Sequence, residues 1–489
     1  MKTPLLIITA LLSLAGTAMA RPSQIMEQQI VTVHVTYQEW NEYRPWLKKS
    51  PGTRTLQGVV ISGNRILMLS SDLNDATLIQ VEKQDRPPRV PARIVHRDPQ
   101  ADLALITVDQ PDFFKDLTPV EIAKQADGDQ IIAAKWRNGQ LSTASCRWSR
   151  TTVRQSKVPY FSYAAIVFIS DLQGGGWGEP LFSNEKLIGI TQYQSDNKIT
   201  VIPAELIQAY LHAAQMPVYP GFASLGANWQ INQGLAQAEY FGLTGTPRGI
   251  LIRNCIPGGS ADGILQPNDI LLELDGHPID SQGDYPHPYY GRLDFSLITT
   301  DGHYAGDTIP ARILRDKREL ALDIPLKNIP CESMRIPTYR IETPPPYLFA
   351  GGFVFRELDI PYLRAWGKNW AEKIPLRLRI YQNMESNNNS GDQRRMIILA
   401  DVFPDEYNLG YHDMAQNIVK TVNTRPVHSI ADLEQAFQHP IEKFHIIEFV
   451  ASYSMSTVIL DSEKFQSATE SIMEKYRIPQ RIRLRNTTP

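Results

Sequence analysis

The residues with reactive side chains are few and widely spread along the chain. Of 489 residues, three are cysteines and ten are histidines. The histidines show no H-x-x-x-H spacing and the cysteines no C-x-x-C spacing, so the sequence predicts no metal site and no cofactor. Cys146, Cys255 and Cys331 form an odd, sparse set. Such a set does not fit a disulfide framework and favours buried, unpaired side chains.

The charge balance excludes one broad class of partner. The chain has 49 Lys and Arg against 52 Asp and Glu, a net charge of -3. Proteins that bind nucleic acid hold its phosphates with clustered positive charge. The one basic run, at residues 481–485, lies at the C-terminus and reads as a solvated tail or an edge strand. We therefore expect no nucleic acid among the partners.

The first 20 residues indicate export. They read MKTPLLIITALLSLAGTAMA, with a positive start at Lys2, an apolar core from Leu5 to Leu14 and a small-x-small cleavage site at residues 18–20. The apolar run is too short to span a bilayer, which favours a secretory signal peptide over an uncleaved anchor. We expect an exported protein without stable membrane insertion, periplasmic if the host is a Gram-negative bacterium.

The rest of the chain divides into a β-rich first part and two later units. From residue 30 to about residue 202, short β-branched runs alternate with turns, which predicts an all-β barrel or sandwich. A helix is expected over residues 204–214. Proline-containing segments at 217–221 and 344–346 then mark two boundaries. Each unit after a boundary shows strands, tight turns and a short helix.

Three motifs, in this order and spacing, carry a resemblance to a known family. They are Gly58-Val59-Val60-Ile61-Ser62, the segment DPQADLAL from Asp98 to Leu105, and the segment GGWGEPL from Gly175 to Leu181. Together they resemble the protease domain of HtrA/Deg serine proteases, and the two later units resemble PDZ domains. The resemblance implies a mainly β protein, with a trypsin-like double β-barrel followed by two α+β PDZ domains. The expected boundaries are 1–20 for the signal peptide, 21–215 for the barrels, 221–330 for the first PDZ domain and 340–489 for the second.

The departures from that family pattern bear on activity. Ser71 stands where the family has its catalytic His, and Trp177 stands where it has its nucleophilic Ser. Asp102 keeps the catalytic Asp position, while Glu179 replaces a glycine. Acyl transfer needs an oxygen or sulfur nucleophile and a base with a pKa near neutral. Neither an indole ring nor a serine hydroxyl supplies these at pH 7, so the resemblance implies a degenerate triad and a pseudo-protease.

Other interpretations of this site stay open. A rearranged triad would need one of the imidazoles before residue 220, at His34, His96 or His212, and none falls in the expected loop. By resemblance, the amides of Gly175 and Trp177 form an oxyanion-like nest, which without a nucleophile would bind anions at best. The ring of Trp177 is expected to fill the cleft where substrate would lie.

Each PDZ-like unit has a glycine-led segment that suits peptide binding. A PDZ domain adds an extended peptide as a strand, and a glycine-containing loop binds the terminal carboxylate. The expected peptide-binding residues are Arg248, Gly249, Ile250, Leu251 and Ile252 in the first unit, and Gly351, Gly352, Phe353, Val354 and Phe355 in the second. The alternatives are an ordinary strand entry in the first unit and a groove filled by the chain itself in the second. Arg248 and Arg356 either assist the carboxylate or are surface charges.

The sequence thus favours an exported, non-catalytic scaffold that binds C-terminal peptides or unfolded protein segments. The alternatives are an active serine endopeptidase of protein quality control with a rearranged site, and a regulatory partner of an active Deg protease. The resemblance also implies a homo-oligomer, a trimer or a multiple of one. An aromatic segment with Tyr37, Trp40, Tyr43 and Trp46 is either such a contact or part of the local core.

Overall fold

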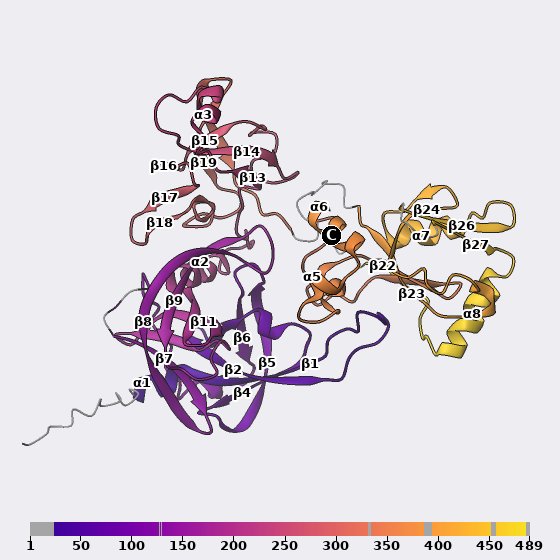
Figure 1. The fold of residues 1–489 in the computed structure, drawn as a ribbon. Coiled ribbons are helices and arrows are strands. Elements are labelled where there is room, and N and C mark those ends of the chain that lie inside the picture. The colour runs from indigo at the N-terminus through magenta and orange to yellow at the C-terminus, as the bar shows by residue number, and fades with distance from the viewer. Residues whose placement is uncertain are drawn as a thin grey trace, which may run out of the picture.

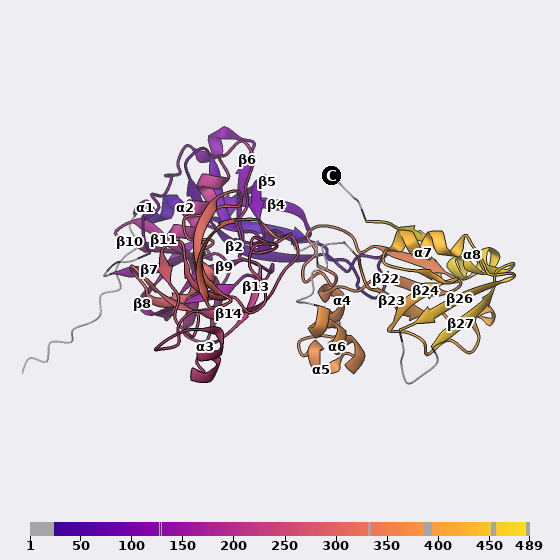
Figure 2. The same ribbon diagram turned by 90° about the horizontal axis from the view of Figure 1, so that it is seen from above.

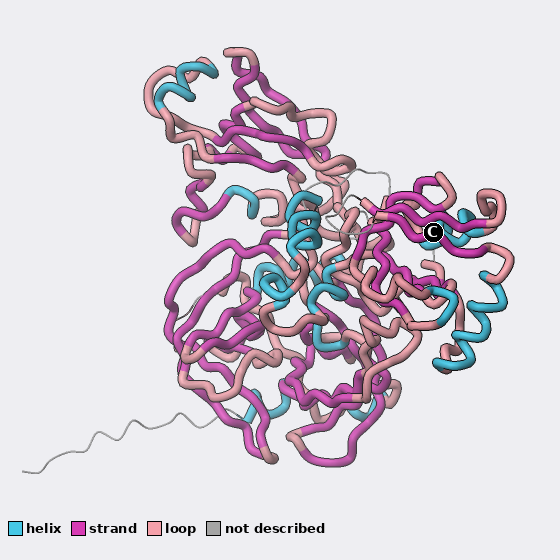
Figure 3. The backbone as a smooth tube through the Cα atoms, turned by 45° about the vertical axis from the view of Figure 1, so that its right-hand side comes forward, coloured by secondary structure: helices cyan, strands magenta, loops and turns pink. Residues whose placement is uncertain are grey.

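A computed structural model describes residues 24–126, 128, 130–330, 334–385, 394–450 and 456–485. The predicted signal peptide, Cys331 and most of a polar loop near residue 390 lie outside the described residues. Within the described ranges, no helix combines the length and the apolar character that crossing a membrane requires. Strands dominate the chain (Figure 3), which confirms the predicted mainly β fold.

The first barrel closes on six strands in the order β1-β2-β3-β6-β5-β4. Val31, Val33 and Val35 are fully buried on one face of β1, as the two-residue period of a strand requires, and His34 lies on the other face. The elements of this part are α1 (Gln24–Gln29), β1 (Ile30–Tyr37), β2 (Gly52–Ile61), β3 (Arg65–Leu69), η1 (Ser71–Leu73), β4 (Ala76–Lys83), β5 (Arg86–Asp98), β6 (Leu103–Val108) and η2 (Pro111–Phe114).

The second barrel has the order β10-β11-β12-β9-β8-β7 and is followed by helix α2. A shared apolar core joins the two barrels, and the indole N–H of Trp136 donates to the Ile30 carbonyl at 2.9 Å. The pair confirms the predicted double barrel. Its elements are β7 (Ile131–Arg137), β8 (Gln140–Gln155), β9 (Ser162–Ser170), β10 (Pro180–Ser183), β11 (Lys186–Ser195), β12 (Lys198–Pro203) and α2 (Ala204–Ala213).

The next unit is a sheet built from strands between Ala227 and Pro325, in the order β13-β14-β15-β19-β20, with β16 paired to β15. Strand β13 therefore lies at one edge, and a separate hairpin, β17–β18, leads into the turn η3. The elements are β13 (Ala227–Gln230), α3 (Leu235–Phe241), β14 (Ile250–Cys255), β15 (Ile270–Leu274), β16 (His277–Pro278), β17 (Asp284–His287), β18 (Gly291–Asp294), η3 (Phe295–Leu297), β19 (Thr308–Arg315) and β20 (Arg318–Pro325).

The last unit is an eight-stranded sheet in the order β27-β26-β24-β23-β22-β21-β28, with β25 paired to β24. Helices α4, α5 and α6 gather beside this sheet (Figure 2). Its elements are β21 (Tyr347–Ala350), β22 (Phe353–Glu357), α4 (Ile360–Arg364), α5 (Trp370–Lys373), α6 (Leu376–Glu385), β23 (Ile397–Val402), η5 (Glu406–Asn408), β24 (Asn417–Val422), β25 (Arg425–Pro426), α7 (Ile430–Phe437), β26 (Phe444–Phe449), β27 (Thr457–Asp461), α8 (Phe465–Tyr476) and β28 (Ile482–Arg483).

The loop between β1 and β2, residues 38–51, forms an arm that reaches the last unit (Figure 1). The ring of Trp46 packs against Tyr347, Phe349 and Phe403 of that unit, at centroid distances of 5.7, 6.3 and 5.8 Å. The Arg483 guanidinium stacks on Trp40 at 4.5 Å. The aromatic segment, expected to be an oligomer contact or local core, therefore makes a contact between two parts of one chain.

Candidate functional site

The structure brings Ser71 and Asp102 into direct contact. The Ser71 amide donates to Asp102 Oδ1 at 2.7 Å, and the Ser70 amide donates to the Asp102 carbonyl at 3.1 Å. Asp102 is 4% exposed and has a φ of 56°, which turns the backbone back toward η1. The predicted degenerate pair thus shares one buried turn, with a backbone amide of residue 71 on the carboxylate.

A glutamine that sequence reasoning missed binds the other carboxylate oxygen. Gln192 on β11 donates from Nε2 to Asp102 Oδ2 at 2.8 Å. Its own carbonyl oxygen accepts the Tyr163 hydroxyl at 2.6 Å, which fixes the amide orientation. Both oxygens of Asp102 are therefore satisfied by N–H donors from the chain, without an imidazole. Only the alternation of polar side chains along β11 could have suggested Gln192.

The loop that precedes β10 is closed around a buried carboxylate. Glu179 is 1% exposed, and its Oε2 accepts the Gly176 amide at 2.8 Å and the Trp177 amide at 3.1 Å. The Gly175 amide donates to the Gln194 side-chain oxygen. The two amides expected to form an oxyanion-like nest therefore already have acceptors within the chain. This corrects the prediction, because a nest needs its N–H groups to be available to a ligand.

The Trp177 side chain lies at the surface of the molecule. It is 48% exposed, so half of the indole faces solvent. Its backbone is anchored instead: the Trp177 carbonyl accepts the Gln57 amide at 3.0 Å, and the Gly178 amide donates to Thr191 at 3.1 Å. The loop is held by its main chain, and a ring on such a loop can remain outside the core.

Several acidic side chains around Ser71 are buried. Burial, and to a smaller extent the nearby Asp102 charge, raise the pKa of Asp72 to about 7. Burial also raises the pKa of Glu179, an effect that the Gly176 and Trp177 amides oppose. The Oδ2 atom of Asp72 is buried without a hydrogen-bond partner. The region around Ser71 is therefore rich in buried carboxylates.

The three imidazoles considered for a rearranged triad are engaged elsewhere. His34 Nε2 contacts Glu82 Oε1 at 2.6 Å on the outer face of β1. His96 Nδ1 contacts the Tyr210 hydroxyl at 3.0 Å, and burial lowers its pKa. His212 lies near the Tyr304 ring, at a centroid distance of 6.1 Å. These contacts give no support to a second triad around Asp102.

The segment that joins the two later units runs beside the Ser71 turn. Tyr339 and Asn74 share a side-chain hydrogen bond, and Glu342 pairs with Arg97. The Arg97 guanidinium also donates to the Ser70 carbonyl at 3.1 Å. The linker therefore contacts the turn that holds Ser71 on one side, which was not expected from the sequence.

The strand predicted to bind peptide in the first unit is an interior strand. Strand β14, which holds Ile250, Leu251 and Ile252, pairs with β13 on one side and with β15 on the other. The Gly249 amide donates to the Ile279 carbonyl at 2.9 Å, and Arg248 pairs with Glu319 at 3.3 Å. The prediction at Arg248 to Ile252 is therefore wrong, because no backbone edge there is free to accept a peptide.

Strand β13, one strand further out, is one of the two edges of this sheet. A cavity of about 510 Å³ lies along it, between the sheet edge and η3. Its walls include the loop Ser224-Leu225-Gly226, the strand residues Ala227 to Trp229, and Phe295 and Ser296 of η3; strands β8 and β9 of the second barrel add Val153 and Ser162. The Trp229 and Phe295 rings meet edge to face at 5.4 Å and form the floor at one end. An edge strand beside an elongated cavity is the geometry that strand addition needs.

In the last unit, other parts of the chain occupy the space beside the predicted peptide-binding segment, Gly351 to Phe355. The Gly351 amide donates to the Thr469 hydroxyl of α8 at 2.8 Å, and a Cβ on Gly351 would lie 3.1 Å from the Phe465 ring. Strand β22, with Phe353, Val354 and Phe355, pairs on both sides and is fully buried. Strand β21 is paired with β28. In the last unit, the structure therefore matches the alternative in which the chain itself fills the groove.

Arg356 is not a surface charge, and its guanidinium is bound by carboxylates of the chain instead of being available to the carboxylate of a peptide. It is 0% exposed and donates to Glu42 Oε2 and to Asp359 Oδ1, both at 3.0 Å. Arg340 pairs with the same two carboxylates. These four side chains form a buried ring of alternating charge that joins the arm to the last unit.

Known proteins resemble the chain in sequence and architecture. A family model described as a PDZ domain matches residues 336–482. The chain is 23% identical over 461 residues to "Protease Do-like 2, chloroplastic" of Arabidopsis thaliana, covering 92% of this chain and 74% of that protein. It is 24% identical to "Protease Do-like 4, mitochondrial" of the same plant, covering 92% and 84%. A solved structure, "HtrA-type protease AlgW with decapeptide", covers 62% of this chain and 96% of its own, with 19% identity and a TM-score of 0.46.

The fold and these matches agree with one another. The chain has two closed six-stranded β-barrels, and its residues 336–482 match the PDZ domain model. Its homologues are HtrA/Deg-family serine proteases, over nearly its whole length.

Proposed function

We propose that the protein is an exported HtrA/Deg-type pseudo-protease that binds peptides or unfolded segments through its first PDZ-like unit. The proposal that the protein is not catalytic rests on the hydrogen bonds made by the Asp102 carboxylate. Both of its carboxylate oxygens accept N–H donors, from the Ser71 backbone and the Gln192 side chain. A carboxylate that is already satisfied has no basic partner to orient, and the side chains at positions 71 and 177 supply no base and no nucleophile.

The loop geometry supports the same proposal. Glu179 occupies the Gly176 and Trp177 amides, so a developing oxyanion would meet a carboxylate instead of free donors. Restoring only the two missing side chains would leave that acceptor in place. We therefore expect the double substitution Ser71→His with Trp177→Ser to remain inactive.

The binding part rests on the edge of β13. Its free side faces the cavity, so an extended peptide can pair with the strand there while Phe295 and Trp229 offer apolar contacts. Main-chain pairing is largely indifferent to peptide sequence, and one or two pockets add selectivity. We expect micromolar affinity for peptides with an apolar last residue, about -8 kcal/mol. A free terminal carboxylate should bind better than an amide.

The test is fluorescence polarisation with the full mature chain and matched free and amidated peptides. Ser296→Trp narrows the cavity without removing any hydrogen bond made by the Ser296 side chain in the structure, and should weaken binding at least about tenfold, or 1.4 kcal/mol. Thr308→Trp, on the exposed side of β19, is the matched control and should leave binding unchanged. If the two variants bound peptide with equal affinity, β13 would not be the peptide-binding site.

Catalysis is tested separately with a fluorophosphonate probe and an unfolded protein substrate. Loss of the base and the nucleophile removes the covalent route, a loss of about a millionfold. We expect neither labelling of a serine in the barrels nor cleavage. Labelling of a barrel serine would show an active site of another kind and end the pseudo-protease proposal.

A further inference from the structure

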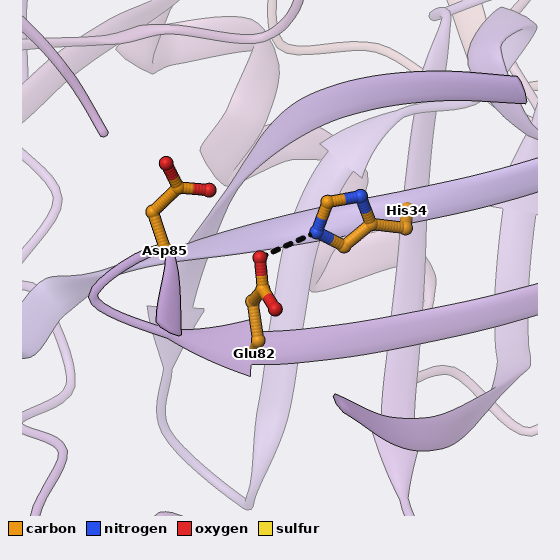
Figure 4. Close-up of side chains that lie close together, drawn as sticks. All are labelled: His34, Glu82 and Asp85. Atoms are coloured by element: carbon orange, nitrogen blue, oxygen red, sulfur yellow. Dashed lines mark hydrogen bonds and ion pairs between the residues drawn. The ribbon is translucent and has the colours of Figure 1, made fainter. Parts of the chain in front are cut away.

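Three potential metal ligands converge on the outer face of the first barrel. They are His34 on β1, Glu82 on β4, and Asp85 in the turn between β4 and β5 (Figure 4). One ligand atom from each side chain lies within 4.8 Å of the other two. His34 Nε2 and Glu82 Oε1 are 2.6 Å apart, and their side chains are 14% and 3% exposed.

The barrel itself creates this convergence. Thr32 lies opposite Glu82 in the pairing of β1 with β4, so His34 is the diagonal neighbour of Glu82 on the same face. Gln84 and Asp85 both have a φ of 52°, and this two-residue turn returns the chain from β4 to β5. Figure 4 shows the carboxylates of Asp85 and Glu82 directed toward the His34 ring.

The remaining polar atoms of the three side chains are held by other residues. Thr55 Oγ1 lies 3.3 Å from His34 Nδ1, and Arg89 Nε donates to Glu82 Oε2 at 3.0 Å. The Gly139 amide donates to Asp85 Oδ2 at 3.3 Å. Outer contacts of this kind orient ligands and fix the histidine tautomer in metal sites. Arg89 leaves Glu82 a single coordinating oxygen, so the site would offer three protein ligands.

We propose that His34, Glu82 and Asp85 bind one divalent transition metal ion, with Zn²⁺ as the fitting probe. Zinc takes imidazole nitrogen and carboxylate oxygen at about 2.0–2.2 Å, often with three protein ligands and a water. The three ligand atoms, which lie within 4.8 Å of one another, are close enough for small side-chain rotations to place all three at this distance from one ion. Two carboxylates beside one guanidinium also leave the net negative charge that a dication needs. The sequence did not predict this site, because its ligands come from positions 34, 82 and 85 and do not form a short motif.

The ion would join β1 to the β4–β5 turn. Asp85 and Arg86 contact Gly139, in the turn between β7 and β8 of the second barrel. Since a ligand that binds only the folded state raises its stability by mass action, zinc should raise the midpoint of thermal unfolding. This readout does not depend on peptide binding or catalysis.

The test is calorimetric titration of ZnCl₂ into the chelator-treated full mature chain. We expect one equivalent to bind saturably and to raise the unfolding temperature. Asp85→Asn, in a surface turn, and His34→Gln should each weaken zinc binding about tenfold or more and abolish the thermal shift. Native mass spectrometry with zinc should show one bound ion, which both variants lose.

The matched control is another histidine with two acidic neighbours. His303 contacts Asp275 at 2.9 Å through Nε2 and Asp307 at 3.9 Å through Nδ1, so its two carboxylates lie on opposite ring nitrogens. His303→Gln should leave zinc binding unchanged. The proposal is overturned if the natural chain shows no saturable zinc binding, or if His34→Gln and Asp85→Asn bind zinc as His303→Gln does.

Discussion

The two units after the barrels share a glycine-led strand but differ in what lies beside the sheet edge. In the first unit, β13 has one free side that faces a cavity of about 510 Å³. In the last unit, β28 pairs with β21, and α8 fills the turn at Gly351. An unpaired edge, and not a glycine before a strand, is what lets a sheet accept another chain.

The largest expected contrast is between two arginines. Arg356 is fully buried between Glu42 and Asp359, whereas the Arg248 side chain is 49% exposed and pairs only with Glu319. Arg356→Met leaves buried carboxylates with one remaining cation and should lower the free energy of unfolding by about 3–5 kcal/mol. Arg248→Met should change it by less than about 0.5 kcal/mol. Urea unfolding measures both, and similar losses would contradict the difference between the units.

A second contrast is between two buried ionisable side chains, Arg356, which has ion-pair partners, and Asp72, whose Oδ2 has no hydrogen-bond partner among the described residues. Burial raises the pKa of Asp72 from 3.8 to about 7. The folded state thus binds a proton more tightly than the unfolded state, so stability falls as the pH rises from about 4 to about 7.

Asp72→Asn should remove that loss. We expect the variant to gain stability at pH 8, with an upper limit of about 4 kcal/mol, and to gain almost nothing at pH 4. Asp112→Asn, at a side chain 79% exposed, is the control and should show no such pH dependence. Denaturant unfolding at the two pH values is the measurement, and an equal gain at both would show that charge burial is not the cause.

Gly249 sharpens the comparison within the first unit. It has a φ of 69°, and a Cβ there would lie 2.5 Å from the Leu271 carbonyl oxygen. Gly249→Val should therefore destabilise the unit by about 2 kcal/mol, through strain and a backbone clash. The folded fraction should still bind peptide at the β13 edge with unchanged affinity. Loss of affinity without loss of stability would return the peptide site to Arg248 to Ile252.

The smallest expected effect concerns the covered edge of the last unit. The Phe349 amide donates to the Arg481 carbonyl at 2.7 Å, just before β28. Arg483→Pro removes the β28 backbone donor at the position paired with Tyr347, and the lost hydrogen bond should cost about 1 kcal/mol. Hydrogen exchange at Phe349 should become faster, while exchange along β22 stays slow. Unchanged exchange at Phe349 would show that β28 does not protect this edge.

Much of the fold follows from local sequence patterns. The short β-branched runs from residue 30 to about residue 202 predicted a barrel or a sandwich, and the resemblance carried by the DPQADLAL and GGWGEPL segments implied the double barrel that the structure contains. These features depend on short-range periodicity and on motif spacing, both of which can be read along one chain.

The errors concern which strands lie side by side. The glycine and apolar run at 249–252 is the same whether its strand lies at an edge or in the interior, so only the pairing with β13 revealed the error. Gln192 and Glu179 reach the Asp102 and Trp177 regions through the register of β11 and the path of one loop. Neither register nor loop path is encoded in a motif that a single sequence displays.

The arm at residues 38–51 connects the first barrel directly to the last unit. Its two ends continue into β1 and β2, and its tip is clamped in the last unit by Glu42 and Trp46. Six residues beyond the arm, Gln57 on β2 donates its amide to the Trp177 carbonyl, and its side chain accepts the Trp136 amide at 2.9 Å. The backbone of β2 therefore runs without interruption from the arm that contacts the last unit to the residue that binds the Trp177 loop.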